Sequence, residues 1–406
     1  MPNQESVDLL GDIPPHWKIV PAWSLYRRVK RTGYENEELL SVYRDHGVIP
    51  KSSRDDNHNI ESEDLSGYQL VKTGDLVMNK MKAWQGSIAL SDHQGIVSPA
   101  YFVFQPLHNG HLKYFHYLLR SKQYIGAYNR ISKGVRIGQW DLDPAYFRTL
   151  PIPVPPVAEQ KAIADFLDTE LGKIDVLITK QLALIDTLKT RIKSTIANAV
   201  LKGLSPSARM IRTSVGWVGE IPQHWDLVRT RYLVDITTGS GDTADAADDG
   251  PYPFYVRSDT PLTSNTWEFD GDAVLTAGDG AGVGKVFHLV SGRFMAHQRV
   301  YVMNRFKRVQ PKYFFYFFSA LFASVALDGS AKSTVDSLRR PTIANMYCTV
   351  PPISEQLEII SYLDRKVMEA GTLVAKTEQV VSVLRERRAA LISAAVTGKI
   401  EVPGRN

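Results

Sequence analysis

The sequence predicts an α+β protein in which two duplicated, mixed α/β globular domains are separated by an antiparallel pair of long helices that form a coiled coil. Three observations predict this fold class. The stretch VPPVAEQKAIADFLD, which begins at Val154, returns as VPPISEQLEIISYLD from Val350, with eight of fifteen positions identical. Other short motifs also recur in the same order. Each copy of the long motif opens a segment with apolar residues every three or four positions, which indicates a helix.

The repeated motifs divide the chain into two similar halves. GDIPPHW at 11–17 returns as GEIPQHW at 219–225, GDLV at 74–77 as GDAV at 271–274, and KYF at 113–115 as KYF at 312–314. Because the order is kept, we interpret the chain as a duplication. We expect globular domains over 1–153 and 210–349, where glycines, aromatic residues and short β-prone runs are frequent. Residues 154–209 form a helical region with a linker, and residues 350–406 a second helical region.

The motif PPxxEQ predicts the start of each long helix. Proline lacks the amide that a strand needs, and it is favoured in the first turn of a helix, where amides have no partner. A carboxylate in that turn interacts favourably with the positive end of the helix dipole. We therefore assign a role at the helix start, or in contact with a partner subunit, to Pro155, Pro156, Glu159 and Gln160, and to Pro351, Pro352, Glu355 and Gln356.

The two helical segments carry the same apolar stripe. In the first it comprises Ile163, Leu167, Leu171, Ile174, Ile178, Ile185, Leu188, Ile192 and Ala199, with Gln181 and Thr195 in the seam. In the second it comprises Ile359, Leu363, Val367, Ala370, Val374, Thr377, Val381, Leu384, Arg388, Leu391 and Ala395. Such spacing keeps one face towards a partner helix. We expect the two helices to pair antiparallel, each about 60 Å long at ~1.5 Å per residue, with the globular parts at opposite ends.

The composition is that of a globular protein that is not bound to a membrane. The net charge of +5 permits a polyanionic partner without requiring one. A single cysteine, Cys348, excludes an intrachain disulfide and is typical of a reducing, cytoplasmic environment. The apolar run 313–327 is shorter than the ~20 residues that a membrane-spanning helix needs, so we expect a buried aromatic helix.

No catalytic constellation is evident in the sequence. GDGAGVGK at 278–285 departs from the Walker A pattern, because Asp279 and Val286 stand where Gly and Ser or Thr are required. We expect a glycine-rich turn that lets the backbone approach something closely, either DNA or, in a tight hairpin without a ligand, only the hairpin itself. The repeated His–Trp pairs, His16–Trp17 and His224–Trp225, are expected to be structural. No HExxH or GxSxG motif is present, and we expect no catalytic residue, metal or cofactor in this chain.

Several segments mix basic residues with amides and aromatic residues, as loops that contact DNA do. They are 79–87, 129–140, 276–285, 296–299 and 328–340. The segments of the two halves are alike in placement and unlike in sequence, which favours two sites that do one task on different targets. The candidate DNA-binding residues are Lys80, Lys82, Trp84, Gln85, Arg130, Lys133, Arg136, Gln139, Lys285, Gln298, Arg299, Lys332 and Ser333.

In combination, these features resemble the specificity subunit of type I restriction–modification enzymes. The resemblance rests on VPPVAEQKAIADFL and VPPISEQLEIISYL, on IPPHW and IPQHW, and on AVTGKI at 395–400 with the looser AVLKGL at 199–204, and it spans essentially the whole chain. It implies a non-catalytic subunit whose two target-recognition domains each read one half of a bipartite sequence in double-stranded DNA, with the helices setting the spacer.

The resemblance also implies partners. Two DNA methyltransferase subunits would dock through the helical regions and use S-adenosylmethionine to methylate adenine at N6. Two restriction subunits would add ATP- and magnesium-dependent translocation and cleavage; the sequence leaves open whether they accompany this chain. Two alternatives also stay open: a structural coiled-coil adaptor with two protein-binding domains, and an orphan sequence-specific DNA-binding regulator.

Overall fold

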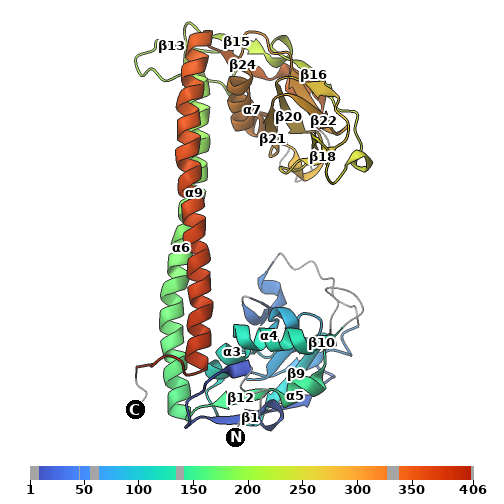
Figure 1. The fold of residues 1–406 in the computed structure, drawn as a ribbon, viewed down its shortest axis with the longest axis vertical. Coiled ribbons are helices and arrows are strands. Elements are labelled where there is room, and N and C mark those ends of the chain that lie inside the picture. The colour runs from blue at the N-terminus through green and yellow to red at the C-terminus, as the bar shows by residue number, and fades with distance from the viewer. Residues whose placement is uncertain (1–8, 45, 55–63, 134–140, 327–337, 404–406) are drawn as a thin grey trace. The chain divides into compact units, whose positions relative to one another are not determined.

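A computed structural model describes the chain except residues 1–8, 45, 55–63, 134–140, 327–337 and 404–406. The described chain forms two compact units, and neither unit coincides with one of the two repeated halves of the sequence. Unit 1 comprises Met1–Gln181 together with Gln379–Asn406, and unit 2 comprises Leu182–Glu378. Each unit therefore contains one globular domain and one half of each long helix (Figure 1).

The globular part of unit 1 is built around a four-stranded antiparallel sheet in the order β2-β9-β6-β7. Its strands are β2 (Tyr26–Val29), β9 (Tyr101–Pro106), β6 (Leu76–Asn79) and β7 (Ile88–Leu90). Two-stranded sheets flank it, formed by β3 (Leu40–Tyr43) with β4 (Gly47–Pro50), β5 (Gln69–Val71) with β8 (Gly95–Val97), and β10 (Ser132–Lys133) with β11 (Asp141–Leu142). The helices of this part are α2 (Ala22–Leu25), α3 (Leu112–Leu119), α4 (Lys122–Ile131) and α5 (Pro144–Thr149), with short 3-10 turns η1 (Lys51–Ser53) and η2 (Ala83–Gln85).

Unit 2 repeats the central sheet with the same order and pairing, β16-β23-β20-β21. These strands are β16 (Asp235–Thr238), β23 (Val300–Asn304), β20 (Ala273–Ala277) and β21 (Phe287–Val290). A second four-stranded sheet contains β18 (Leu262–Ser264), β17 (Tyr252–Tyr255), β22 (Arg293–Ala296) and β19 (Phe269–Asp270). The remaining elements are β13 (Met210–Arg212), β14 (Glu220–Pro222), η3 (Thr230–Tyr232), η4 (Thr243–Asp245), η5 (Gly280–Gly282), α7 (Pro311–Ala326) and α8 (Arg340–Asn345). The shared strand order supports the duplication inferred from the motifs.

A short antiparallel pair of strands closes each globular part beside its long helix. In unit 1, β1 (Lys18–Pro21) pairs with β12 (Pro151–Val154), and in unit 2, β15 (Asp226–Arg229) pairs with β24 (Tyr347–Val350). The prolines that follow β12 and β24 end these strands. Each long helix begins directly after its pair of prolines: α6 (Val157–Lys202) after Pro156, and α9 (Ile353–Val396) after Pro352.

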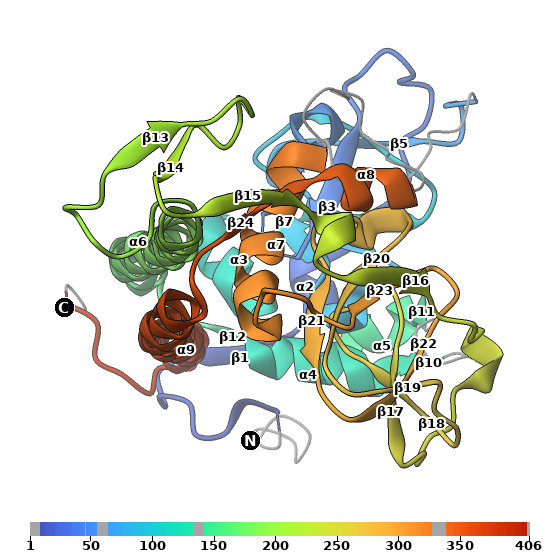
Figure 2. The ribbon, with the colours of Figure 1, turned by 90° about the horizontal axis from the view of Figure 1, so that it is seen from above.

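The predicted fold class is confirmed. Within each unit the long helices lie side by side (Figure 2), and they run antiparallel, because unit 1 contains the start of α6 and the end of α9. In unit 1, Arg388 Nε lies 3.0 Å from Asp175 Oδ1, and in unit 2, Ala199 and Val200 share a core with Ile359 and Leu363. The predicted stripe is buried or half-buried at every position except one.

The exception is Val367, which is 37% exposed, while the side chain of the neighbouring Lys366 is 40% exposed and pairs with Glu369. A helix of 3.6 residues per turn drifts relative to a strict alternation of three and four.

The aromatic run was correctly predicted as a buried helix. In α7, Tyr313, Phe314, Phe317, Phe318 and Phe322 are fully buried, and the helix packs against β20 and β21. Its rings stack on one another, with centroids of Phe318 and Phe322 4.5 Å apart. Among the described residues, no helix is long and apolar enough to cross a membrane.

Candidate nucleic-acid interface

Three segments of unit 1 meet around the backbone of Lys80, which follows β6. The Lys80 amide donates to the Ala100 carbonyl at 3.0 Å, in the connection between β8 and β9. The Leu142 amide of β11 donates to the Lys80 carbonyl at 3.1 Å. We call the residues Asn79–Ser87, Ser98–Ala100 and the β10–β11 strands the first loop junction.

Unit 2 contains the same arrangement around Gly278, which follows β20. The Gly278 amide donates to the Arg299 carbonyl at 2.7 Å, and the Leu338 amide donates to the Gly278 carbonyl at 2.7 Å. Residues Gly278–Lys285, His297–Arg299 and Leu338 form the second loop junction. Because Gly278, Arg299 and Leu338 make the bonds that Lys80, Ala100 and Leu142 make in unit 1, the two junctions are equivalent.

The first loop junction contains four of the candidate DNA-binding residues. Lys82 is exposed, and Lys80 is half-buried with its ammonium group on the Pro99 carbonyl. Trp84 and Gln85 lie in η2, where Trp84 Nε1 donates to the Met81 carbonyl at 2.9 Å and Gln85 Oε1 accepts from Arg44 at 3.2 Å. All four therefore lie within one short connection between β6 and β7.

The second loop junction contains three further candidates. Lys285 is exposed at the end of the glycine-rich turn. Gln298 Nε2 donates to Asp242 Oδ2 at 3.2 Å, and Arg299 Nη1 donates to Asp279 Oδ2 at 2.5 Å. The segments 276–285 and 296–299, which are apart in the sequence, are thus in direct contact through Arg299 and Asp279.

The remaining candidates are placed less completely. Arg130 is exposed in the last turn of α4, two residues before Ser132, which pairs with Leu142. It therefore lies at the edge of the first loop junction. Lys133 belongs to β10, but its side chain is outside the described part of the chain, as are the residues Arg136, Gln139, Lys332 and Ser333.

The glycine-rich turn approaches the backbone of its own unit. A Cβ on Gly278 would lie 2.8 Å from the Arg299 carbonyl oxygen, and one on Gly282 would lie 2.7 Å from the Arg257 carbonyl oxygen. Both distances are shorter than real Cβ contacts allow. These glycines therefore let the turn lie against the neighbouring segments that contain Arg299 and Arg257.

The basic run Arg27–Arg31 contributes to the first junction, although it was not among the predicted residues. The Arg28 guanidinium carbon lies 4.4 Å from the centroid of Phe102, and Lys80 Nζ lies 4.9 Å from the same centroid. Burial, together with the positive charges of Arg28 and Lys30, lowers the pKa of Lys80 below its usual value although Asp141 opposes the shift. Like charges held together in this way favour an anionic ligand. The run of basic residues itself was the signal in the sequence.

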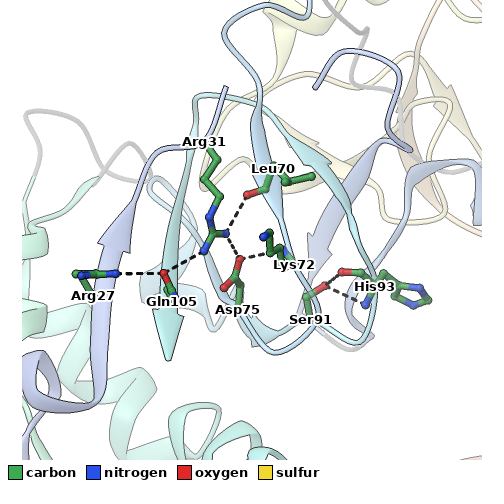
Figure 3. A network of polar contacts seen from close by, with 8 residues as sticks. All are labelled: Arg27, Arg31, Leu70, Lys72, Asp75, Ser91, His93 and Gln105. Atoms are coloured by element: carbon green, nitrogen blue, oxygen red, sulfur yellow. Dashed lines mark hydrogen bonds and ion pairs between the residues drawn. The ribbon is translucent and has the colours of Figure 1, made fainter. Parts of the chain in front are cut away.

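Not all of this run is available to a ligand. Figure 3 shows Arg31 directed towards Asp75, whose Oδ2 lies 2.5 Å from Arg31 Nη1 and also accepts from the Lys72 amide at 2.9 Å. Gln105 Oε1 accepts from Arg31 at 3.4 Å and from Arg27 at 3.5 Å. Asp75 is buried, so Arg31 serves to hold β2 against the turn before β6.

A concavity of about 540 Å³ lies beside strand β2. Its lining includes the exposed side chains of Trp23, Arg27, Arg28 and Arg148. Three guanidinium groups around an indole ring suit a phosphate-bearing ligand, because guanidinium groups bind phosphate oxygens in pairs of hydrogen bonds.

Arg257 and Asp279 of unit 2 were also absent from the candidate DNA-binding residues predicted from the sequence. Arg257 Nη1 donates to Asp279 Oδ1 at 2.9 Å, so Asp279 is paired with both Arg257 and Arg299. Burial raises the pKa of Asp279, but the two guanidinium groups outweigh it and leave the pKa below its usual value. Burial and the charge of Arg257 lower the pKa of the neighbouring His297. Nothing in the local sequence of Arg257 indicates this role.

The helix-start residues form an internal hydrogen-bond cluster in unit 1. Glu159 Oε1 accepts from Trp17 Nε1 at 2.9 Å, and Glu159 Oε2 lies 2.9 Å from His16 Nε2. Gln160 Nε2 donates to the Pro155 carbonyl at 2.8 Å, while Gln160 Oε1 accepts from the His111 amide at 2.8 Å. The cluster thus joins the start of α6 to the segments before β1 and α3.

The second copy repeats these bonds in unit 2. Glu355 accepts from Trp225 Nε1 at 2.8 Å and lies 2.6 Å from His224 Nε2. Gln356 Nε2 donates to the Pro351 carbonyl at 2.9 Å, and Gln356 Oε1 accepts from the Gln310 amide at 2.7 Å. Of these eight helix-start residues, Pro156 and Pro352 are exposed and Glu355 is half-buried, whereas the other five are buried.

Comparison with known proteins identifies the family. The protein-family model for the type I restriction modification DNA specificity domain matches the chain twice, over residues 34–186 and 222–379. The chain belongs to this family. The first match contains the first loop junction, and the second match contains the second loop junction. Neither match includes residues 380–406, at the end of the second helical region.

Two curated relatives of this specificity-domain family illustrate the similarity. The type I restriction enzyme EcoDI specificity subunit of Escherichia coli is 29% identical over 45% of this chain and 40% of its own length. The EcoKI specificity subunit of Escherichia coli strain K12 is 21% identical over 96% of this chain and 90% of its own length. A solved chain from a study of complex assembly and conformational transition of the type I R-M system has a TM-score of 0.72 at 15% identity, over 96% of this chain and all of that chain. At that identity the structural similarity concerns the fold.

Proposed function

We propose that this chain is the DNA sequence-recognition subunit of a type I restriction–modification complex, and that each loop junction contacts one half of a bipartite target. One observation supports this most strongly: the two family matches contain equivalent junctions that carry different side chains. Lys80, Lys82 and Trp84 occupy the first junction, whereas Asp279, Lys285 and Arg299 occupy the second. A shared backbone with different side chains suits two sites that read different base sequences.

The charge distribution supports a DNA ligand. The patch of Arg28, Lys30 and Lys80 contacts a single aromatic ring or lies near it, and the adjacent concavity adds Arg148. Contacts of this kind with phosphates provide affinity that falls with salt concentration, while side chains at base edges provide sequence specificity.

The chain would act without chemistry of its own. Adenine methylation with S-adenosylmethionine would belong to two methyltransferase subunits that dock along the helical regions. ATP- and magnesium-dependent cleavage would belong to restriction subunits. The paired helices α6 and α9 would set the length of the unread spacer between the half-sites.

The experiment that tests this function is co-expression of the chain with its genomically adjacent methyltransferase, followed by mapping of adenine methylation by single-molecule sequencing. We expect a new bipartite motif with a spacer of constant length, and no new methylation when the methyltransferase is expressed alone. Replacing residues 1–153 with those of a relative should change one half of the motif only. If no motif appears although both proteins are soluble, the recognition function is wrong and an adaptor function is favoured.

A further inference from the structure

Asp279 lies between two arginines that come from different strands of unit 2. Arg257 follows β17, Arg299 follows β22, and Asp279 lies in the turn after β20. Asp279 Oδ1 accepts from Arg257 at 2.9 Å and Asp279 Oδ2 accepts from Arg299 at 2.5 Å, so each carboxylate oxygen holds one guanidinium group. We call these three residues the arginine fork.

The backbone around the arginine fork is held by specific contacts. The Gly278 amide donates to the Arg299 carbonyl, and Gly282 lies against the Arg257 carbonyl with no space for a side chain. The Arg299 amide donates to His297 Nδ1 at 3.0 Å, and the ring of His297 stacks on that of Phe254, which is fully buried. Both arginines therefore start from a defined backbone position.

Exposure differs sharply within the fork. The Asp279 side chain is 13% exposed, whereas the side chains of Arg257 and Arg299 are 45% and 58% exposed. The carboxylate is thus largely covered, and the guanidinium groups face outwards. Each arginine bonds to Asp279 through its Nη1 atom, and a guanidinium group carries five N–H donors. The fork carries a net charge of +1 and leaves donors for a ligand.

We propose that Asp279 positions Arg257 and Arg299 to read guanine in the half-site of the second domain. A guanidinium group matches the O6 and N7 acceptors of guanine in the major groove, where it forms two parallel hydrogen bonds. Holding the arginines in place before binding reduces the rotamer entropy that is lost on complex formation. The inference rests on the proposed function, and it names Arg257 and Arg299 as specificity-determining residues and Asp279 as a positioning residue.

A purely structural ion pair makes different predictions. Loss of an ion pair that only stabilises the fold would change thermal stability and would not alter which base is preferred. Arg293 provides a matched control in the same domain: it pairs with Asp270 at 3.3 Å, stacks at 4.7 Å over the ring of Trp267, and is about as exposed as Arg299. It lies at the opposite end of β22 from Arg299.

The test uses the full chain in complex with its methyltransferase and a DNA duplex that contains the mapped target. Guanines in the half-site of the second domain are replaced one at a time by 7-deazaguanine, which lacks the N7 acceptor but pairs normally. We expect the wild-type complex to bind the substituted duplex roughly 5- to 100-fold more weakly at one or two guanines. Arg299→Ala and Arg257→Ala should each abolish the discrimination at one guanine, and Arg299→Lys should not restore it because lysine lacks the planar fork. Asp279→Asn should reduce discrimination at both guanines together, and Arg293→Ala should leave it unchanged.

The possible outcomes separate this inference from the proposed function. If a bipartite motif is mapped but its second half contains no guanine, or if the fork variants discriminate as the wild type does, the arginine fork is not a guanine reader and the proposed function stands. A fork variant that loses thermal stability but keeps the discrimination also overturns the inference. If no motif is found at all, both fail.

Discussion

Trp17 and Glu159, 142 positions apart in the chain, are joined by a hydrogen bond of 2.9 Å between the indole Nε1 and the carboxylate Oε1. Trp225 and Glu355 form the same bond at 2.8 Å in the second copy. Each indole also covers the end of the other long helix: Trp17 packs on Gly398 after α9, and Trp225 packs on Gly203 after α6. Both glycines have positive φ, as is typical of a residue that ends a helix. In each unit, one tryptophan therefore joins the start of one long helix to the end of the other.

We expect Glu159→Ala to destabilise unit 1 by about 1.5–3 kcal/mol, because a buried indole N–H loses a charged acceptor. Glu355→Ala should cost less in unit 2, since the Glu355 side chain is 34% exposed and that of Glu159 is 7% exposed. Hydrogen exchange of the first turns of α6 and α9 in rising urea measures the two effects separately. Glu170→Ala removes a half-buried acid of α6 that pairs only with the exposed ammonium group of Lys173 among the hydrogen bonds described, and it should change stability by less than about 0.5 kcal/mol. Equal losses for Glu159 and Glu355 would contradict the dependence on burial.

The stability of unit 1 should fall as the pH drops below about 6.5. Burial lowers the pKa of His116 from 6.5 to about 3, and burial lowers the pKa of His108 to about 4. Below pH 6.5 the unfolded chain therefore binds protons that the folded unit does not, which favours unfolding as the pH falls towards 4. The stability contributed by the two neutral rings is complete above pH 6.5.

Removing either ring should make the pH dependence shallower. We expect the denaturation midpoint of His116→Asn to vary less between pH 6.5 and 4 than that of the wild type, whatever its absolute stability. His108→Asn should have a smaller effect because its pKa is shifted less. Urea denaturation at several pH values provides the measurement. A His116→Asn profile parallel to that of the wild type would show that this histidine is not responsible.

Arg148→Ala should weaken DNA binding equally for all sequences. Arg148 lines the concavity beside Trp23 and Arg28, where we expect a phosphate contact, and the loss of one such contact lowers the slope of log K against log salt by about 1. Binding of the methyltransferase complex to cognate and non-cognate duplexes at several salt concentrations measures both quantities. Lys173→Ala, on α6, is the matched loss of one positive charge and should leave the slope unchanged. A change in the preferred sequence would contradict a phosphate contact.

Removing four residues from each long helix, at levels that face each other as defined by the Asp175–Arg388 ion pair, should change the spacer between half-sites or abolish recognition. Four residues correspond to about 6 Å of helix, together with a change in the direction of the following residues. Methylation mapping reads the spacer directly. Removing four residues from α6 alone is the control, because it breaks the match between the two stripes and should cost folding stability. An unchanged spacer after paired deletions would exclude the helices as the ruler.

Much of the architecture was predictable because its signals are local or periodic. Proline pairs that follow β-prone residues indicate where α6 and α9 begin, and apolar residues at steps of three and four indicate which faces pair. The duplicated motifs further show that both domains share one plan. Every position of the two predicted stripes is buried or half-buried except Val367, which is 37% exposed.

The loop segments were predictable only as regions. Lys80 directly follows the central strand β6, whereas Gln298 and Arg299 directly precede the central strand β23, and these ends of equivalent sheets form the two junctions. Their partners were not predictable. Arg28 shares the ring of Phe102 with Lys80, although 52 positions separate the two cations, and no spacing rule connects them.

The sequence by itself determined the duplication, the two long helices with their starting points, the mixed α/β domains and the family, because each depends on the order and spacing of residues along the chain. Only the tertiary structure decided that Glu159 and Glu355 accept hydrogen bonds from tryptophans of earlier segments, and that Asp279 holds Arg257 and Arg299. These contacts depend on strand pairing and on how closely glycine allows one backbone to approach another. Side chains from distant segments meet only after those pairings place their backbones within a few ångströms of each other.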